Sequence, residues 1–128
     1  MEVKDARKAQ GAGTQVLLRR QARKLFAPKG YAAANTNELV GRAKLTKGAL
    51  YHHFANKREI YQAVVEDMEQ ELVERLEKAG AGREPWERLR AMCRAYLDAC
   101  LDPGLARMVV LGPPVVLGWK AWCKLQHK

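Results

Sequence analysis

The chain has 128 residues, of which 48% are hydrophobic and 29% charged, and its formal net charge is +9. A chain of this length folds as one domain, or as a small domain with part of a second, and its hydrophobic content excludes a disordered protein. The N-terminus is charged from its second residue, which excludes a secretory signal. The most apolar segment, residues 108–119, is too short and too broken by Gly and Pro to span a bilayer, so we expect a cytoplasmic protein without membrane association.

The positive charge is confined to the first part of the chain. Residues 1–57 contain 12 Lys and Arg against 3 acidic residues, whereas residues 58–128 contain 11 of each kind. Charge segregated in this way indicates a polyanionic partner for the first part. Nucleic acid is the first candidate, and an anionic membrane surface is the second.

The first elements in the chain are an arm and a helix. Residues 1–13 are polar and include two glycines, which predicts a loose basic N-terminal arm. Thr14 is then expected to cap a first helix that Pro28 and Gly30 end. Its apolar stripe has helical spacing and consists of Leu18, Ala22, Leu25 and Phe26.

Two capping signals close together predict two short helices. Asn35 followed by Glu38 is a capping box that opens the second helix, with Leu39, Val40 and Ala43 directed inward. Thr46 is a natural N-cap for a third helix. Only a short turn near Lys44 separates the two helices, which is typical of a helix-turn-helix, here over about residues 35–54.

The rest of the chain also has helical periodicity. Asn56 and Glu59 form a second capping box, which opens a long helix over residues 57–78 with inward positions Ile60, Val64, Met68, Leu72 and Leu76. Glycines at residues 80–82 break it, and a fifth helix runs from Pro85 to about residue 101. A short helix follows over residues 105–111. Residues 112–114 then turn the chain into a last helix that carries two tryptophans.

These elements predict an all-α fold without sheet. We expect three parts: a basic arm over residues 1–13, a three-helix domain with the helix-turn-helix over residues 14–56, and, over residues 57–128, a long linking helix with an incomplete helical regulatory domain.

The third helix has the composition of a nucleic-acid face. Leu50 and Phe54 are four residues apart and point inward, which leaves Gly48 and Ala49 on the other face. Small residues there allow a helix to approach base edges in the major groove, where Ala49 can contact a thymine methyl and Lys47 can reach guanine acceptors or a phosphate. Donors that suit phosphate oxygens flank them at Tyr51, His52, His53 and Lys57.

Other chemistries are less well supported. Neighbouring histidines on a helix point about 100° apart, so His52 and His53 cannot hold one metal ion. The chain has no serine, and its cysteines lie in the electrically neutral part, so nothing indicates a catalytic nucleophile. We therefore expect no metal, no cofactor and no enzymatic activity. The glycine at position 48 could also be unremarkable, at a cost of about 1 kcal/mol to its helix.

The sequence from about Thr14 to Val65, with the motifs LFAPKGY and KGALYHHF and an Asn-Lys pair that opens the fourth helix, resembles the N-terminal domain of TetR-family transcriptional regulators. The resemblance is looser through residues 85–103 and 109–122. It implies base reading by Thr46, Lys47, Gly48 and Ala49. It also implies backbone contacts by Tyr51, His52, His53 and Lys57, and we add Asn35, the cap of the second helix, to the DNA-binding set.

The chain departs from the family pattern in two ways that matter here. Lys44 stands where the turn usually has glycine, and a left-handed lysine costs roughly 1–2 kcal/mol. Family members usually continue into two further helices that form the dimer interface. The chain therefore looks incomplete at its C-terminus, and homodimerisation is an open question.

The resemblance implies a bacterial cytosolic repressor that binds a palindromic operator in double-stranded DNA and is released by a small-molecule ligand. Apolar and aromatic residues of the second part are the candidate ligand contacts, although such residues are more often core: Met92, Tyr96, Met108, Leu111, Trp119 and Trp122. The alternative is a truncated helical interaction protein that does not bind DNA and forms heterodimers with an intact relative.

Overall fold

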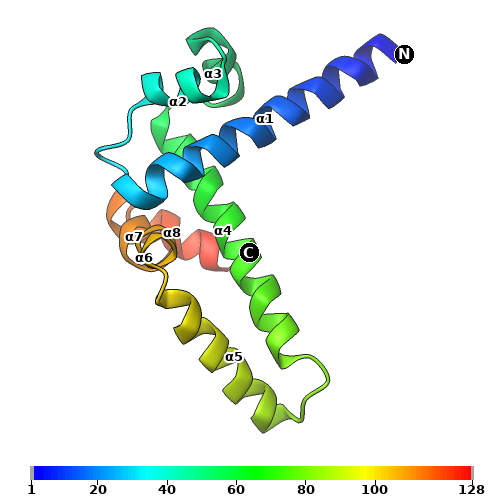
Figure 1. The fold of residues 1–128 in the computed structure, drawn as a ribbon, viewed down its shortest axis with the longest axis vertical. Coiled ribbons are helices and arrows are strands. Elements are labelled where there is room, and N and C mark those ends of the chain that lie inside the picture. The colour runs from blue at the N-terminus through cyan, green and yellow to red at the C-terminus, as the bar shows by residue number, and fades with distance from the viewer. Residues whose placement is uncertain (1, 128) are drawn as a thin grey trace. The chain divides into compact units, whose positions relative to one another are not determined.

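The computed structural model describes residues 2–127, which are mostly helical and contain no strand (Figure 1). The all-α prediction is therefore confirmed. The elements are α1 (Glu2–Lys29), α2 (Thr36–Ala43), α3 (Lys47–His53), α4 (Lys57–Gly80), α5 (Pro85–Cys100), α6 (Pro103–Leu105), the π-helix η1 (Ala106–Leu111), α7 (Gly112–Leu117) and α8 (Trp119–Gln126).

The chain forms two compact units, residues 1–64 and residues 65–128. The long helix α4 contributes its first part to one unit and its second part to the other. This division falls inside α4, whereas the predicted helix-turn-helix domain ends at residue 56, and the predicted domain bounds stay a prediction.

The expectation of a loose arm over residues 1–13 is wrong for the described residues, because α1 begins at Glu2. Most of this segment consists of Ala, Lys, Arg, Glu and Gln, which are strong helix formers and outweigh the two glycines. Thr14 is consequently not an N-cap. It lies inside α1, where its hydroxyl donates a hydrogen bond to the Gln10 carbonyl oxygen at 3.0 Å.

The core of the first unit contains the predicted residues except Val40, which was expected to face inward and is half-buried. The α1 stripe and the inward residues of α2, α3 and the start of α4 are at most 5% exposed: Leu18, Ala22, Leu25, Phe26, Leu39, Ala43, Leu50, Phe54, Ile60 and Val64. Burial of side chains this size contributes about 1.5–3 kcal/mol each relative to exposure, so this core fixes α3 against α1 and α4.

In the turn between α2 and α3, Lys44 has a backbone conformation that is unfavourable for lysine. Lys44 has φ 54° and ψ 42°, a left-handed conformation, and its N–H donates to the Gly41 carbonyl oxygen at 3.3 Å. A left-handed L-residue costs roughly 1–2 kcal/mol, which glycine avoids.

We expect Lys44→Gly to raise the free energy of unfolding by about 1 kcal/mol, because relief of the left-handed strain exceeds the added chain entropy of glycine. Urea denaturation followed by circular dichroism measures the change. A decrease in the free energy of unfolding would show that the Lys44 side chain makes compensating contacts that outweigh the strain.

The second unit depends on a close approach between α4 and α5. A Cβ atom at Gly80 would lie 2.8 Å from Cγ of Arg88 and 2.9 Å from Cγ of Met92, so only glycine allows this spacing. The chain then turns at Gly82, which has φ 71°. Gly80 is therefore required by the close contact with α5, and Gly82 is required by its left-handed backbone conformation.

The C-terminal segment differs from its prediction. Residues 112–114 do not form a turn but begin α7, where Pro113 follows the first position of the helix and Met108 and Leu117 are buried nearby. Proline suits the first turn of a helix because its fixed φ is already close to the helical value. The chain bends instead at Gly118, which has φ 85° and precedes α8.

Within the described residues, no single helix is long and apolar enough to cross a membrane, although the bent pair Pro85–Cys100 and Pro103–Leu117 meets the length and composition criteria jointly, with an angle of 94°.

Candidate nucleic-acid interface and ligand cavity

Helix α3 is held by its cap and by two buried side chains. The Thr46 hydroxyl oxygen accepts a hydrogen bond from the Ala49 N–H at 3.1 Å, so Thr46 is the predicted N-cap. Leu50 is fully buried and Phe54 is 5% exposed. These contacts fix the rotation of α3 about its axis and leave its other face in solvent.

The sequence-predicted DNA-binding residues all lie in the first unit. Asn35, Thr46, Lys47, Gly48, Tyr51 and His52 are exposed, and Ala49, His53 and Lys57 are half-buried. Because no DNA is present, their contacts with it remain predictions. Asn35 caps α2 by accepting from the Asn37 N–H at 2.8 Å, while the other predicted member of that capping box, Glu38, pairs instead with Lys29 Nζ at 2.8 Å.

The glycine at position 48 is not demanded by the fold. Its φ is not in the left-handed region, and a Cβ built there would meet only Thr46 Oγ1, at an ordinary 3.8 Å. In a helix, glycine costs about 1 kcal/mol relative to alanine. Since neither backbone conformation nor packing explains it, the lack of a side chain at the exposed start of α3 favours a close approach to an external partner.

Lys57 lies at the first turn of α4, next to a cluster of three aromatic rings. The Tyr31 and Tyr61 rings meet edge to face at 5.2 Å between centroids, and Phe26 contacts both. Lys57 Nζ lies 4.4 Å from the Tyr31 ring centroid, a cation–π contact. Burial lowers the pKa of Lys57 below its ordinary value and raises the pKa of Tyr61 to about 12. The cluster orients Lys57 while leaving part of its surface free.

The junction between α3 and α4 is short and doubly capped. Asn56 Oδ1 accepts from the Glu59 N–H at 2.9 Å, and Glu59 Oε2 accepts from the Ala55 N–H at 2.9 Å. The second capping box is therefore confirmed, with the carboxylate bound one residue before the cap. Such a junction couples the direction of α3 to that of α4.

The second unit contains a cavity of about 510 Å³ between α4, α5, η1 and α8. Its walls are largely apolar, with acidic and amide side chains among them, and consist of Glu66, Glu69, Gln70, Leu72, Val73, Leu76, Tyr96, Val109, Val110, Trp122, Leu125 and Gln126. Its volume lies in the range of small-molecule sites, roughly 300–1,000 Å³. The indole Nε1 of Trp122 is buried and has no hydrogen-bond partner within the described residues.

Two of the six candidate ligand contacts, Tyr96 and Trp122, line this cavity. Met92 lines a shallower groove with Leu76, Cys93, Tyr96 and Leu97. Met108 is fully buried in the core, and Leu111 and Trp119 are 70% and 67% exposed, so these three do not line the cavity. The sequence analysis did not name the cavity residues of α4 as candidate ligand contacts. A helix face that lines a cavity has the same hydrophobic periodicity as a helix face that packs in a core.

Two carboxylates, Glu66 and Glu69, line the cavity. Glu69 Oε1 accepts a hydrogen bond from Gln126 Nε2. Burial raises the pKa of Glu69 above its ordinary value, the hydrogen bond from Gln126 opposes this shift, and the negative charge of Glu66 adds to it. The cavity therefore suits a ligand with an apolar body and a hydrogen-bond donor or positive charge that meets these carboxylates.

We expect Glu69→Gln to stabilise the second unit near neutral pH. A carboxyl whose folded pKa is raised favours folding below its unfolded pKa and loses that contribution as pH rises through the folded pKa. The thermal midpoint of the variant should therefore exceed that of the parent at about pH 7.5, with the difference shrinking toward about pH 4. Exposed Glu77 on the same helix provides the control, Glu77→Gln. Equal pH profiles for the two variants would contradict a buried, destabilising charge at Glu69.

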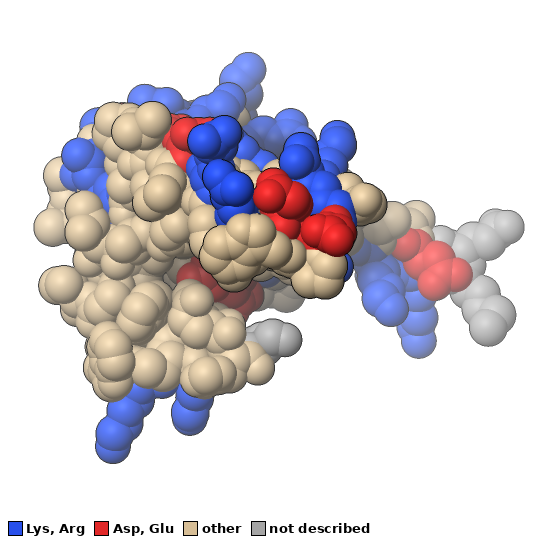
Figure 2. All heavy atoms as spheres, turned by 90° about the horizontal axis from the view of Figure 1, so that it is seen from below, with Lys and Arg blue, Asp and Glu red and all other residues tan. Residues whose placement is uncertain are grey.

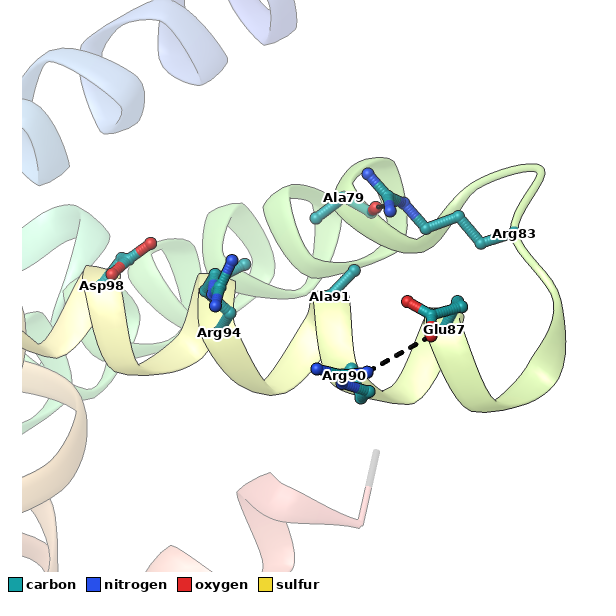
Figure 3. A pocket seen from close by; sticks show the side chains of 8 residues that line it. Ala79, Arg83, Glu87, Arg90, Ala91, Arg94 and Asp98 are labelled. Carbon is teal, nitrogen blue, oxygen red and sulfur yellow. Dashed lines mark hydrogen bonds and ion pairs between the residues drawn. The ribbon is translucent and has the colours of Figure 1, made fainter.

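A second groove of about 360 Å³ in this unit is lined mainly by charged residues of α5 (Figure 3). Arg83, Arg90 and Arg94 lie along it, and Arg90 pairs with Glu87 at 3.4 Å. Asp98 lies at the other end of the row, so acidic groups accompany the arginines. No group of three or more His, Cys, Asp and Glu that could hold a metal ion occurs within residues 2–127.

Comparison with known families agrees with this arrangement at both ends of the chain. Residues 18–64 match the model of bacterial regulatory proteins of the tetR family, and residues 86–128 match the model of a tetracyclin repressor-like C-terminal domain. The chain belongs to the TetR family. The recognition made from the sequence is thereby confirmed, and the helix-turn-helix is the family's N-terminal domain.

Three TetR-family relatives illustrate the similarity. The transposon Tn10 TetC protein of Escherichia coli is 29% identical over 119 residues, which are 93% of this chain and 60% of that protein. A TetR-family transcriptional regulator from Pectobacterium atrosepticum is 40% identical in structural superposition, with a TM-score of 0.76 over 86% of this chain and 57% of that one. A gamma-butyrolactone receptor is 27% identical, with a TM-score of 0.60 over 77% of this chain and 50% of that chain. The chain thus spans about half to three-fifths of these relatives.

Proposed function

We propose that this TetR-family chain is a sequence-specific DNA-binding transcriptional repressor of the bacterial cytosol. The observation that carries the proposal is the exposed start of α3, where Gly48 has a helical backbone and no packing neighbour that requires glycine. It lies between Lys47 and Ala49 in the unit that holds the whole positive excess of the chain. A partner that approaches closely and carries negative charge fits both facts.

The proposed contacts divide into two kinds. Thr46, Lys47, Gly48 and Ala49 at the first turn of α3 would meet base edges in the major groove. Asn35, Tyr51, His52, His53 and Lys57 would donate to phosphates and set the position of α3 without reading sequence. As a homodimer, the chain would recognise a palindrome whose half-sites lie one DNA turn apart, roughly 34–36 Å.

The small-molecule part of the proposal rests on the cavity in the second unit. Relatives of this chain include an A-factor receptor of Streptomyces griseus, 48% identical over 46 residues, and the gamma-butyrolactone receptor. We propose that a ligand with an apolar body binds between α4, α5, η1 and α8, with Tyr96 and Trp122 among its contacts. Because α4 is capped directly onto α3, a ligand that prefers a different position of α4 would tilt α3 and separate the half-site contacts.

Selection from a random duplex pool, followed by sequencing, tests the repressor proposal. The purified chain at near-physiological salt should enrich a palindrome with half-sites about one turn apart. Enrichment of no sequence, with only salt-sensitive binding, would overturn it. For the ligand, titration with a panel of hydrophobic amines and lactones should shift tryptophan fluorescence, and a Trp122→Phe variant should lose most of that change.

A second candidate function is supported by the apolar face of α5. Trp86, Leu89, Leu97 and Leu101 follow helical spacing and are 53–80% exposed. A face of this kind suits a helical interaction protein that pairs with an intact relative and does not bind DNA itself. Such a chain would enrich no sequence alone but would weaken DNA binding by the Pectobacterium regulator when the two are mixed.

A further inference from the structure

The N-terminal end of α1, before Gly11, projects beyond α2 and α3 (Figure 1). In the core, one face of α1 carries Leu18, Ala22 and Leu25, which are at most 2% exposed. Continued toward the N-terminus at the same helical spacing, that face passes through Gly11 and reaches residues 4–8. The face that packs the helix-turn-helix therefore extends past it into solvent.

This extended face is basic. At about 100° per residue, Lys4, Arg7 and Lys8 fall within an arc of roughly 100° centred on the direction of Gly11. All three are exposed, and acidic Asp5 lies outside the arc. In Figure 2, blue Lys and Arg atoms project from this end of α1, at the right of the view, with red acidic atoms beside them. The stripe that is apolar over residues 18–26 thus becomes cationic over residues 4–8.

The contact between Gly11 and α3 shows which way this face is turned. A Cβ atom at Gly11 would lie 3.9 Å from Cε1 of His53, one of the proposed phosphate donors. Gly11 lies in the middle of the extended face, so the cations are on the side of α1 that is turned toward α3. These cations therefore continue the proposed DNA-contact surface. They do not lie on the side of α1 that is turned away from α3.

We propose that Lys4, Arg7 and Lys8 form a second DNA-contact surface, which binds phosphates that flank the site read by α3. At a rise of 1.5 Å per residue, Lys4 lies roughly 10 Å along the helix from Gly11, which corresponds to about three base pairs of duplex. Ammonium and guanidinium groups suit phosphate oxygens. The proposal rests on the proposed DNA-binding function and adds a sequence-independent extension of the footprint.

A membrane surface is the other polyanion that a basic helix can bind, but α1 lacks the means to enter one. Membrane-surface helices pair a basic face with a large apolar face. Outside the basic arc, this part of α1 carries Ala6, Ala9, Ala12 and Gly13, with Val3 as the one large apolar side chain among residues 3–13. DNA is therefore the partner that this surface fits.

The chain offers a matched pair of variants on opposite faces of one helix. Arg7→Ala with Lys8→Ala removes two cations from the extended face. Arg20→Ala with Lys24→Ala removes one Arg and one Lys from exposed positions on the other side of α1. Both changes replace charge by the best helix former, so α1 is retained, and both lower the net charge equally. The probe is a 30-base-pair duplex carrying the sequence most enriched by the parent chain.

Fluorescence anisotropy from about 50 to 300 mM salt gives the slope of log K against log salt. The Arg7/Lys8 variant should reduce the magnitude of that slope by about 1.8 per protomer, at 0.9 per phosphate contact, and the Arg20/Lys24 variant should leave it unchanged. Hydroxyl-radical footprinting should show about three fewer protected base pairs on the outer flank of each half-site. The bases enriched from a random pool should be the same for both variants.

Equal slopes and footprints for the two variants would overturn the proposal while leaving sequence-specific binding by α3 intact. Binding of the parent to vesicles with 30% phosphatidylserine that is lost in the Arg7/Lys8 variant, with no effect on DNA, would assign the surface to membranes and also overturn it. If the parent enriches no sequence, that result contradicts the proposed repressor function itself. The proposed second DNA-contact surface, which depends on that function, is then overturned as well.

Discussion

Replacing Gly48 with leucine is expected to weaken binding of the parent's enriched duplex by about 100-fold or more while stabilising the protein. In the free chain, a Cβ atom at this position would meet only Thr46 Oγ1, at an ordinary 3.8 Å. Against DNA, it would hold the first turn of α3 away from the base edges and disrupt more than one base contact, each worth about 1–3 kcal/mol. In the free chain, removing a helical glycine adds about 0.5–1 kcal/mol to the free energy of unfolding.

The matched control for this prediction is Gly13→Leu. Gly13 is also an exposed helical glycine with no atom within 4 Å of its built Cβ, but it lies on the side of α1 away from α3. It should gain stability as Gly48→Leu does and retain full affinity, by fluorescence anisotropy and urea denaturation. Unchanged affinity in Gly48→Leu would rule out the start of α3 as the DNA-contact surface.

The largest expected loss of stability follows from Leu50→Ala, because Leu50 is fully buried between α3 and the rest of the first unit. Truncation of buried leucine to alanine costs about 2–5 kcal/mol. That is a large fraction of the stability of a small domain, so DNA binding should fall with the folded fraction. Urea denaturation followed by circular dichroism measures the first effect.

A substitution at the neighbouring residue, Tyr51, distinguishes an effect on DNA binding from an effect on folding. Tyr51 is 49% exposed and belongs to the proposed phosphate contacts, so Tyr51→Ala should change the free energy of unfolding by at most about 0.5 kcal/mol and still weaken DNA binding. If Tyr51→Ala proved the more destabilising of the two, the rotation of α3 assigned here would be wrong.

The helix-turn-helix was predictable because local signals and burial agree there. Thr46 and Asn56 cap α3 and α4 as their sequence patterns predict, and Leu50 and Phe54 point inward at a spacing of four. Each of these features depends on residues a few positions apart, which a sequence states directly. Lys44 is a further local signal. The sequence places lysine where the turn usually has glycine, and the structure has the left-handed backbone at this residue.

The N-terminal arm and the ligand cavity were harder to predict for different reasons. The arm was mistaken for a loop because two glycines outweighed the helix propensity of the residues around them. The cavity depends on distances between helices, which periodicity does not contain. Its most distinctive feature, Glu69 beside Gln126, joins residues 57 positions apart and has no local signature.

Photo-crosslinking tests the central claim most directly. In the duplex enriched by the parent chain, 5-bromodeoxyuridine replaces thymine one position at a time, so that bromine occupies the place of the methyl group that Ala49 is proposed to contact. Irradiation and mass spectrometry then identify the attached peptide. The account predicts crosslinks within residues 46–51 from positions inside the half-sites. Crosslinks confined to the second unit, or an absence of crosslinks to α3 at every thymine of the half-sites, would contradict it.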